Sequence, residues 1–118
     1  MTKSVPDPLP PGYTVGAYKI ESELPAAGMG RVYKAVRITG WHEVVAINVL
    51  SPALRDPENV GRFFWCCKLA WERATREGTS TVLNIFDIEG VIGVVVGYTD
   101  ASGPATDVAN EWSRPTRG

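Results

Sequence analysis

Apolar residues recur along this chain with two different periods, and the change of period separates strands from a helix. Alternation of apolar and polar residues, or a short run of β-branched residues, indicates a strand. Five stretches have one of these patterns: residues 18–24, 31–38, 44–50, 81–90 and 91–99. The last two meet at Glu89 and Gly90, which predicts a hairpin turn between them.

The period changes to that of a helix after the third strand. Between residues 57 and 76 the apolar side chains fall within one stripe at about 100° per residue, which predicts an amphipathic helix. Asp56 followed by Pro57 is typical of an N-cap and a first helical turn, and Gly78 is typical of a helix end. This order of elements predicts an α+β fold, in which a five-stranded antiparallel sheet over residues 18–98 packs one helix on a face.

Composition and charge are those of an ordinary globular domain. The 118 residues are 44% hydrophobic and 21% charged, with a net charge of −1. We expect no nucleic-acid partner and no membrane partner, because the chain has no basic surface and its longest apolar run, residues 91–98, is too short to cross a bilayer. We expect a cytoplasmic protein with a flexible leader at 1–17, one folded domain at 18–99 and a disordered tail at 100–118.

Few side chains are candidates for metal binding or catalysis. Cys66 and Cys67 are adjacent, which disfavours a disulfide between them, so we expect reduced packing residues. With His42 as the single histidine and no Cys-x-x-Cys, no zinc site is expected. Asn48 is the unusual residue, because it interrupts the apolar run 44–50 and burying it unpaired would cost roughly 1–3 kcal/mol.

Five short motifs, in this order, resemble those of the N-terminal lobe of a bacterial-type serine/threonine protein kinase. They are AGMGRVYKA at 27–35, VVAINVL at 44–50, RFF at 62–64, LNIFDIEG at 83–90 and VVVGY at 94–98. In the family these correspond to the glycine-rich loop, the Val-Ala-Ile-Lys strand, the start of the regulatory helix, and the two strands that lead into the hinge. The resemblance extends over about two thirds of the chain and implies a kinase-like N-lobe at 18–99.

The resemblance implies a vestigial nucleotide site in which several parts are changed. Its residues are Gly28, Gly30, Val32, Ala46, Asn48, Val96 and Tyr98. Asn48 occupies the place of the lysine that pairs with the phosphates of ATP and with a helix glutamate, and a neutral amide cannot offset phosphate charge. The family's Gly-x-Gly-x-x-Gly loop corresponds here to Pro25, Ala27 and Gly30, so only the third glycine is kept.

The helix glutamate is also absent. Alignment on Arg62 and Phe63 puts Cys66 at its position, whereas counting back from the fourth strand puts Ala70 there, and neither residue is acidic. Glu72 lies on the side of the helix away from the apolar stripe, so the role is not transferred to it. At the hinge, the gatekeeper position falls on Val96 and Gly97 replaces the usual acidic residue. Val32, Ala46 and Val96 are then either the walls of a purine slot or plain sheet core.

These changes imply a degenerate, truncated kinase-like domain without catalytic activity. The 118 residues contain no His-Arg-Asp catalytic loop and no Asp-Phe-Gly magnesium motif, so we expect no metal, no cofactor and at most weak ATP binding. Three hypotheses remain open. The chain is a pseudokinase fragment that acts, if at all, as a binding or regulatory module; or the ATP-binding half of a kinase completed by another chain; or a structural interaction domain without nucleotide.

The resemblance also implies a protein partner or self-association. In a kinase one side of this lobe packs on the nucleotide and on the second lobe. We expect that side to be uncovered here, with Val32, Ala46, Val96 and the 65–69 side of the helix forming an exposed apolar patch. Such a patch predicts association with another protein or with a second copy of the chain.

Overall fold

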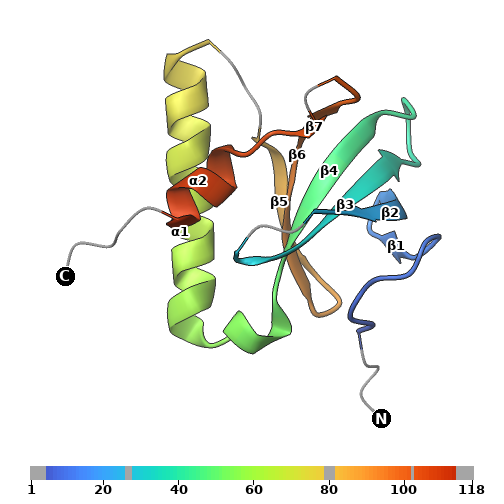
Figure 1. Cartoon of the computed structure of the whole chain (residues 1–118), viewed down its shortest axis with the longest axis horizontal. Coiled ribbons are helices and arrows are strands. Elements are labelled where there is room, and N and C mark those ends of the chain that lie inside the picture. The colour runs from blue at the N-terminus through green and yellow to red at the C-terminus, as the bar shows by residue number, and fades with distance from the viewer. Residues whose placement is uncertain (1–4, 26–27, 79–81, 102, 114–118) are drawn as a thin grey trace.

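The computed structural model describes residues 5–25, 28–78, 82–101 and 103–113, which form one sheet and two helices (Figure 1). The elements are β1 (Thr14–Val15), β2 (Tyr18–Leu24), β3 (Gly30–Arg37), β4 (Val44–Leu50), the 3-10 turn η1 (Pro52–Leu54), α1 (Pro57–Arg76), β5 (Val82–Ile88), β6 (Val91–Thr99), β7 (Gly103–Pro104) and α2 (Asp107–Ser113). None of the helices in these ranges is long and apolar enough to span a membrane.

The predicted α+β fold is confirmed. The five predicted strands and the predicted helix are β2, β3, β4, β5, β6 and α1. Every strand pair is antiparallel, and the order across the sheet is β1-β2-β3-β4-β6-β5, with β7 added to β6. The sheet is larger than predicted because two-residue strands, such as β1 and β7, carry too few residues to show an alternating pattern.

Local signals account for the ends of the main elements. The Asp56 carboxylate accepts a hydrogen bond from the Asn59 backbone N–H at 3.1 Å and another from the Asn59 side-chain amide at 2.7 Å, which caps α1. Pro57 occupies the first turn, and Gly78, with a φ of +77°, follows the helix end. Glu89 and Gly90 both have positive φ, as the predicted tight turn between β5 and β6 requires.

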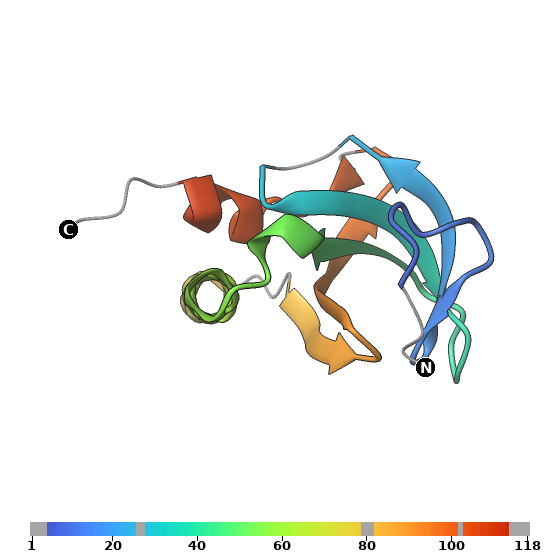
Figure 2. The same ribbon diagram turned by 90° about the horizontal axis from the view of Figure 1, so that it is seen from below.

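Each face of the sheet supports its own apolar core. Figure 2 shows the sheet curving away from the helices, with α1 seen along its axis and α2 beside it. On the helix side, Val32, Ala46 and Val96 pack in one cluster with residues of α1 and α2. On the opposite side, Ile20, Tyr33, Ala35, Val45, Ile47 and Val95 form a second cluster with Leu9 and Val15. Because successive side chains along a strand point to opposite faces, the strands contribute residues to two cores, one on each face of the sheet.

The two edges of the sheet differ in length. One edge is the two-residue β1. The other is β5, where Leu83 and Ile85 are exposed and the register shifts between Val82 and Asn84. Directly after this irregularity, the backbone N–H of Ile85 donates a hydrogen bond to Oδ1 of Asn84 at 2.9 Å.

The N-terminal segment differs from the flexible leader that the sequence predicted. Leu9 and Val15 are buried on the second face of the sheet, and the backbone N–H of Leu9 donates to the Tyr33 hydroxyl at 2.9 Å. Nearby, Asp7 pairs with the Arg31 guanidinium at 2.7 Å. These contacts order residues 5–15 because the two apolar side chains cover strands that water would otherwise reach; residues 1–4 lie outside the described ranges.

The C-terminal segment also differs from the prediction, which was disorder from residue 100 onwards. Residues 103–104 pair with β6, and residues 107–113 form α2. Val108 and Trp112 are one helical turn apart, so both point into the core between α1 and the sheet. Most residues around this apolar pair are small or polar, so the composition of the segment predicts disorder. Residues 102 and 114–118 lie outside the part of the chain that the structure describes.

Candidate nucleotide-facing site

Strand pairing brings together four of the predicted site residues. Val32 of β3 lies opposite Asn48 of β4, and Ala46 of β4 lies opposite Val96 of β6. Val32, Ala46 and Val96 belong to the core cluster on the helix side of the sheet. Asn48 is two residues along β4 from Ala46, so its side chain is on the same side. The three predicted walls of a purine slot are therefore neighbours.

Asn48 is buried, with 3% of its surface exposed. The structure shows no hydrogen bond from its side-chain amide to any described residue. On the facing helix, Cys66 and Ala70 are both buried in the same cluster, so both positions suggested for the helix glutamate face the sheet without a carboxylate. Glu72 is exposed, and its Oε1 atom lies 4.0 Å from the ammonium nitrogen of Lys68 on the same helix. Asn48 and α1 therefore offer no pair of opposite charges at this point.

Lys34 lies beside the candidate site, although it is not among the residues predicted from the sequence. It is two residues along β3 from Val32 and opposite Ala46, so it lies on the same side of the sheet. Its ammonium nitrogen is 3.9 Å from Asp100 Oδ1 and 5.4 Å from the centre of the Tyr98 ring. The charge is thus held at the hinge end of the strands. The period-two spacing from Val32 was the signal that could have identified it.

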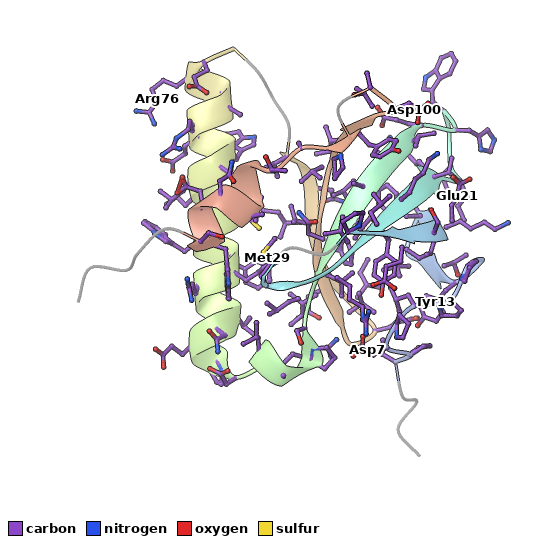
Figure 3. The ribbon with its side chains drawn as sticks, in the orientation of Figure 1. Asp7, Tyr13, Glu21, Met29, Arg76 and Asp100 are labelled. Atoms are coloured by element: carbon purple, nitrogen blue, oxygen red, sulfur yellow. The ribbon has the colours of Figure 1, made fainter. Side chains whose placement is uncertain are left out.

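The glycine-rich loop is held by its own strand contacts. Gly30 has a φ of +156°, and a Cβ there would lie 2.0 Å from the Val49 carbonyl oxygen. Met29 is fully buried between the sheet and the helices (Figure 3). By contrast, Gly28 and Pro25 are exposed, and Ala27 lies outside the described residues. The kept glycine is therefore required by the close approach of β3 to β4.

A hollow of about 320 Å³ adjoins this loop, and its lining includes Gly28, Gly30, Ser51 and Arg31. The Arg31 guanidinium is already paired, with Asp7 at 2.7 Å and with Glu23 at 2.7 Å. Hydrogen bonds to these two carboxylates raise the pKa of Arg31 above its ordinary value. Two acidic partners therefore already offset the charge of the cation that lines this hollow.

The hinge strand and the predicted slot are covered by later residues of the same chain. The Gly97 carbonyl accepts a hydrogen bond from the Ala105 N–H at 2.8 Å, and Tyr98 lies opposite Pro104 in the β6–β7 pair. Val108 and Trp112 of α2 share the core cluster with the three predicted wall residues. The expected uncovered patch is therefore absent at these residues, since Val32, Ala46 and Val96 are 4%, 0% and 1% exposed. On the 65–69 side of α1, only part of the surface is open, with Trp65 exposed.

Comparison with known proteins now gives the fold a name. No protein-family model and no curated protein sequence matches the chain. Among solved structures, the PknI kinase domain of Mycobacterium tuberculosis is similar at 27% identity over 78% of this chain, with a TM-score of 0.54. A double mutant of the same kinase domain is similar at 29% identity over 78% of this chain, with a TM-score of 0.53. The fold is that of a protein kinase N-terminal lobe. The chain spans 36% and 37% of the length of those two kinase domains.

In this kinase-like lobe, α1 is attached to α2 by two arginines. Arg73 Nη2 lies 3.0 Å from Glu111 Oε1, and the Glu111 side chain is only 5% exposed. The Arg62 guanidinium stacks 4.1 Å from the centre of the Trp112 ring and donates a hydrogen bond to the Trp112 carbonyl. Of these four residues, only Arg62 belongs to a predicted motif, the RFF stretch at 62–64. Their charges lie on α1 and α2, whereas the position on β4 where the family has its lysine carries an amide.

Proposed function

We propose that the chain is a catalytically inactive, kinase-like N-lobe, a pseudokinase domain that acts as a binding or regulatory module. The observation that carries the proposal is the buried Asn48 on β4, on the side of the sheet that the helices cover, together with Cys66 and Ala70 at the two α1 positions suggested for the glutamate. Phosphoryl transfer depends on positioning and neutralising the triphosphate. The described residues at this point supply neither a cation for the phosphates nor a carboxylate to hold that cation.

Two further observations support loss of nucleotide chemistry. The cation on this face, Lys34, is engaged with Asp100 and Tyr98 at the hinge end. The backbone carbonyl of Gly97, in the hinge strand that adenine uses in the family, already accepts a hydrogen bond from Ala105. Likeness to kinase domains at 27% and 29% identity supports the kinase-like lobe as the framework of the proposal.

A structural interaction domain without nucleotide is the second candidate. It is favoured by the burial of Val32, Ala46 and Val96 under the chain's own helices, because a slot that is filled by protein has no need of a ligand. The two candidates agree that the chain transfers no phosphate. They differ in whether weak ATP binding persists.

The test is a phosphotransfer assay with a thermal-shift titration. With labelled ATP and magnesium, the purified chain is expected to transfer no phosphate to itself or to a generic protein substrate. Micromolar ATP is expected to leave the melting temperature unchanged, whereas a ligand at about 100 times its Kd would add about 2.7 kcal/mol of stability. Asn48→Lys is the matched comparison and should not restore either signal, because Cys66 and Ala70 still provide no carboxylate.

Phosphate transfer or stabilisation by ATP would count against the proposal as follows. Reproducible incorporation of phosphate that a substitution in this chain abolishes would contradict inactivity. A clear stabilisation by ATP without transfer would favour a nucleotide-binding module. Association with another protein or with a second copy stays a prediction, which sedimentation velocity of the purified chain measures directly.

A further inference from the structure

We infer that residues 103–113 act as an intramolecular latch. The latch closes the helix side of the sheet, where Val32, Ala46 and Val96 form the predicted purine slot, and it holds α1 in place. The latch consists of β7, the connection at residues 105–106, and α2. The inference rests on the proposed function and deepens it, since it concerns the same face. It assigns to this segment a regulatory contact that is made within the chain.

The first part of the latch is fixed to the hinge strand. β7 pairs with β6, with Tyr98 opposite Pro104 and Thr99 opposite Gly103. One residue later, the Ala105 N–H donates to the Gly97 carbonyl at 2.8 Å. These backbone contacts turn the chain back along the lobe. They determine where α2 begins and direct it towards α1, as Figure 1 shows.

The second part is an apolar anchor. Val108 is fully buried, and Trp112, one helical turn later, is 8% exposed. Both belong to the cluster that contains Ala46, Val96 and Cys66, so α2 fills space next to the predicted purine slot. Burial of an aromatic ring and a branched side chain is the main favourable contribution to docking of this helix.

The third part is a pair of charged contacts at the end of α2. Arg73 of α1 pairs with the nearly buried Glu111, and a buried carboxylate depends on such a partner to offset its lost hydration. Arg62 of α1 stacks on the Trp112 ring and donates to the Trp112 carbonyl near the C-terminus of α2, where a cation also interacts favourably with the helix dipole. Two arginines from different turns of α1 thus hold one short helix.

The length of α2 makes the latch a two-state element. Isolated helices shorter than about 12 residues are marginal in water, so a seven-residue helix is helical only while it is docked. Undocking is then an order-to-disorder transition that exposes the covered face and releases α1. A ligand of that face can bind only those molecules in which the latch is open. Its apparent affinity is therefore the intrinsic affinity multiplied by the open fraction.

Cys66 provides a built-in reporter of this transition. This residue is 4% exposed and belongs to the core cluster that contains Val108 and Trp112, which puts it near the docked α2. Burial raises the pKa of the Cys66 thiol, and it raises the pKa of the neighbouring Cys67 to about 12. We propose to measure the rate at which iodoacetamide alkylates the native full chain, with the number of labels counted by intact-protein mass spectrometry.

Trp112→Ala is the test variant, and Trp71→Ala is the matched control because this tryptophan of α1 is 50% exposed. In Trp112→Ala we expect the first label to appear about tenfold faster or more, since the ring and its contacts with Arg62 contribute to docking. In Trp71→Ala we expect the wild-type rate. Glu111→Gln removes the charge of the pair with Arg73 while keeping the shape, and it should also accelerate the first label.

The labelling pattern decides the inference. Faster single labelling in Trp112→Ala and Glu111→Gln, with the control unchanged, supports the latch. Wild-type rates in both variants would overturn it. If Trp112→Ala unfolds, both cysteines label together, and Glu111→Gln then decides alone. The measurement involves no nucleotide, so its failure and the failure of the proposed function are independent results.

Discussion

Gly30→Ala is expected to destabilise the protein by about 3–5 kcal/mol, although it adds a single methyl group. The family resemblance explains the glycine by the approach of a phosphate to the backbone. In the structure the neighbour is instead protein, because a Cβ at this position would lie 2.0 Å from the Val49 carbonyl oxygen and 2.7 Å from the Ser51 nitrogen. Backbone atoms of this kind cannot rotate out of the way.

The magnitude follows from what must move. A non-glycine residue at a φ of +156° is strained by about 1–3 kcal/mol. Relief of the clash separates the start of β3 from the end of β4 and breaks the hydrogen bond from the Ser51 N–H to the Met29 carbonyl, at 3.0 Å, for about 1–3 kcal/mol more. Met29 is fully buried beside that bond, so its displacement adds to the cost.

Urea unfolding followed by tryptophan fluorescence measures the effect, and Gly28→Ala is the control. Among the residues that the structure describes, no atom lies within 4 Å of a Cβ built on Gly28, so alanine there should change the free energy of unfolding by less than about 1 kcal/mol. With equal m-values, the shift in midpoint gives the difference in stability directly. Similar midpoints for the two variants would refute the assignment of Gly30 to strand packing.

Three further substitutions test the contacts that order the chain. Leu9→Ala should lower the free energy of unfolding by about 2–3 kcal/mol in urea titrations, because this side chain of the N-terminal segment is buried against the second face of the sheet; an unchanged midpoint would mean that this segment does not pack. Tyr33→Phe should lower it by about 1 kcal/mol through loss of the acceptor for the Leu9 N–H. Hydrogen bonds from Asn59 lower the pKa of Asp56 below its ordinary value of 3.8. The stability that the ionised Asp56 cap contributes is therefore fully present above pH 3.8, and it is lost as the pH falls through the lowered pKa. The gap in melting temperature between wild type and Asp56→Ala should therefore narrow in acid, and a constant gap would contradict the cap.

The sequence was sufficient for the elements whose pattern repeats over several residues. β2, β3, β4, β5, β6 and α1 each show at least two periods of apolar spacing, and each was predicted. The short elements were not, because a seven-residue helix such as α2 has no stability of its own and is formed by docking. Its apolar pair, Val108 and Trp112, carries a helical spacing but only one turn of it. Contacts between segments decide such cases.

The sequence was sufficient to predict which residues of the candidate site are neighbours, but not which contacts cover or require them. Register places Val32, Ala46 and Val96 side by side, as the order of motifs implied. What covers them was not predictable, since the partner is a later segment whose composition suggested disorder. The reason that position 30 requires glycine was also not predictable. A motif shows which residue is present, whereas the contact that requires this residue appears only in three dimensions.

The two edges of the sheet bear on how this small protein avoids aggregation. A long open strand invites pairing with another molecule, and natural sheets shorten, bend or occupy such strands. At one edge β1 has only two residues to offer. At the other, the irregularity between Val82 and Asn84 interrupts β5, and the Ile85 amide is engaged by the Asn84 side chain before a foreign strand can reach it. Both ends of the sheet are thus poor templates for fibril growth, even though Leu83 and Ile85 face solvent.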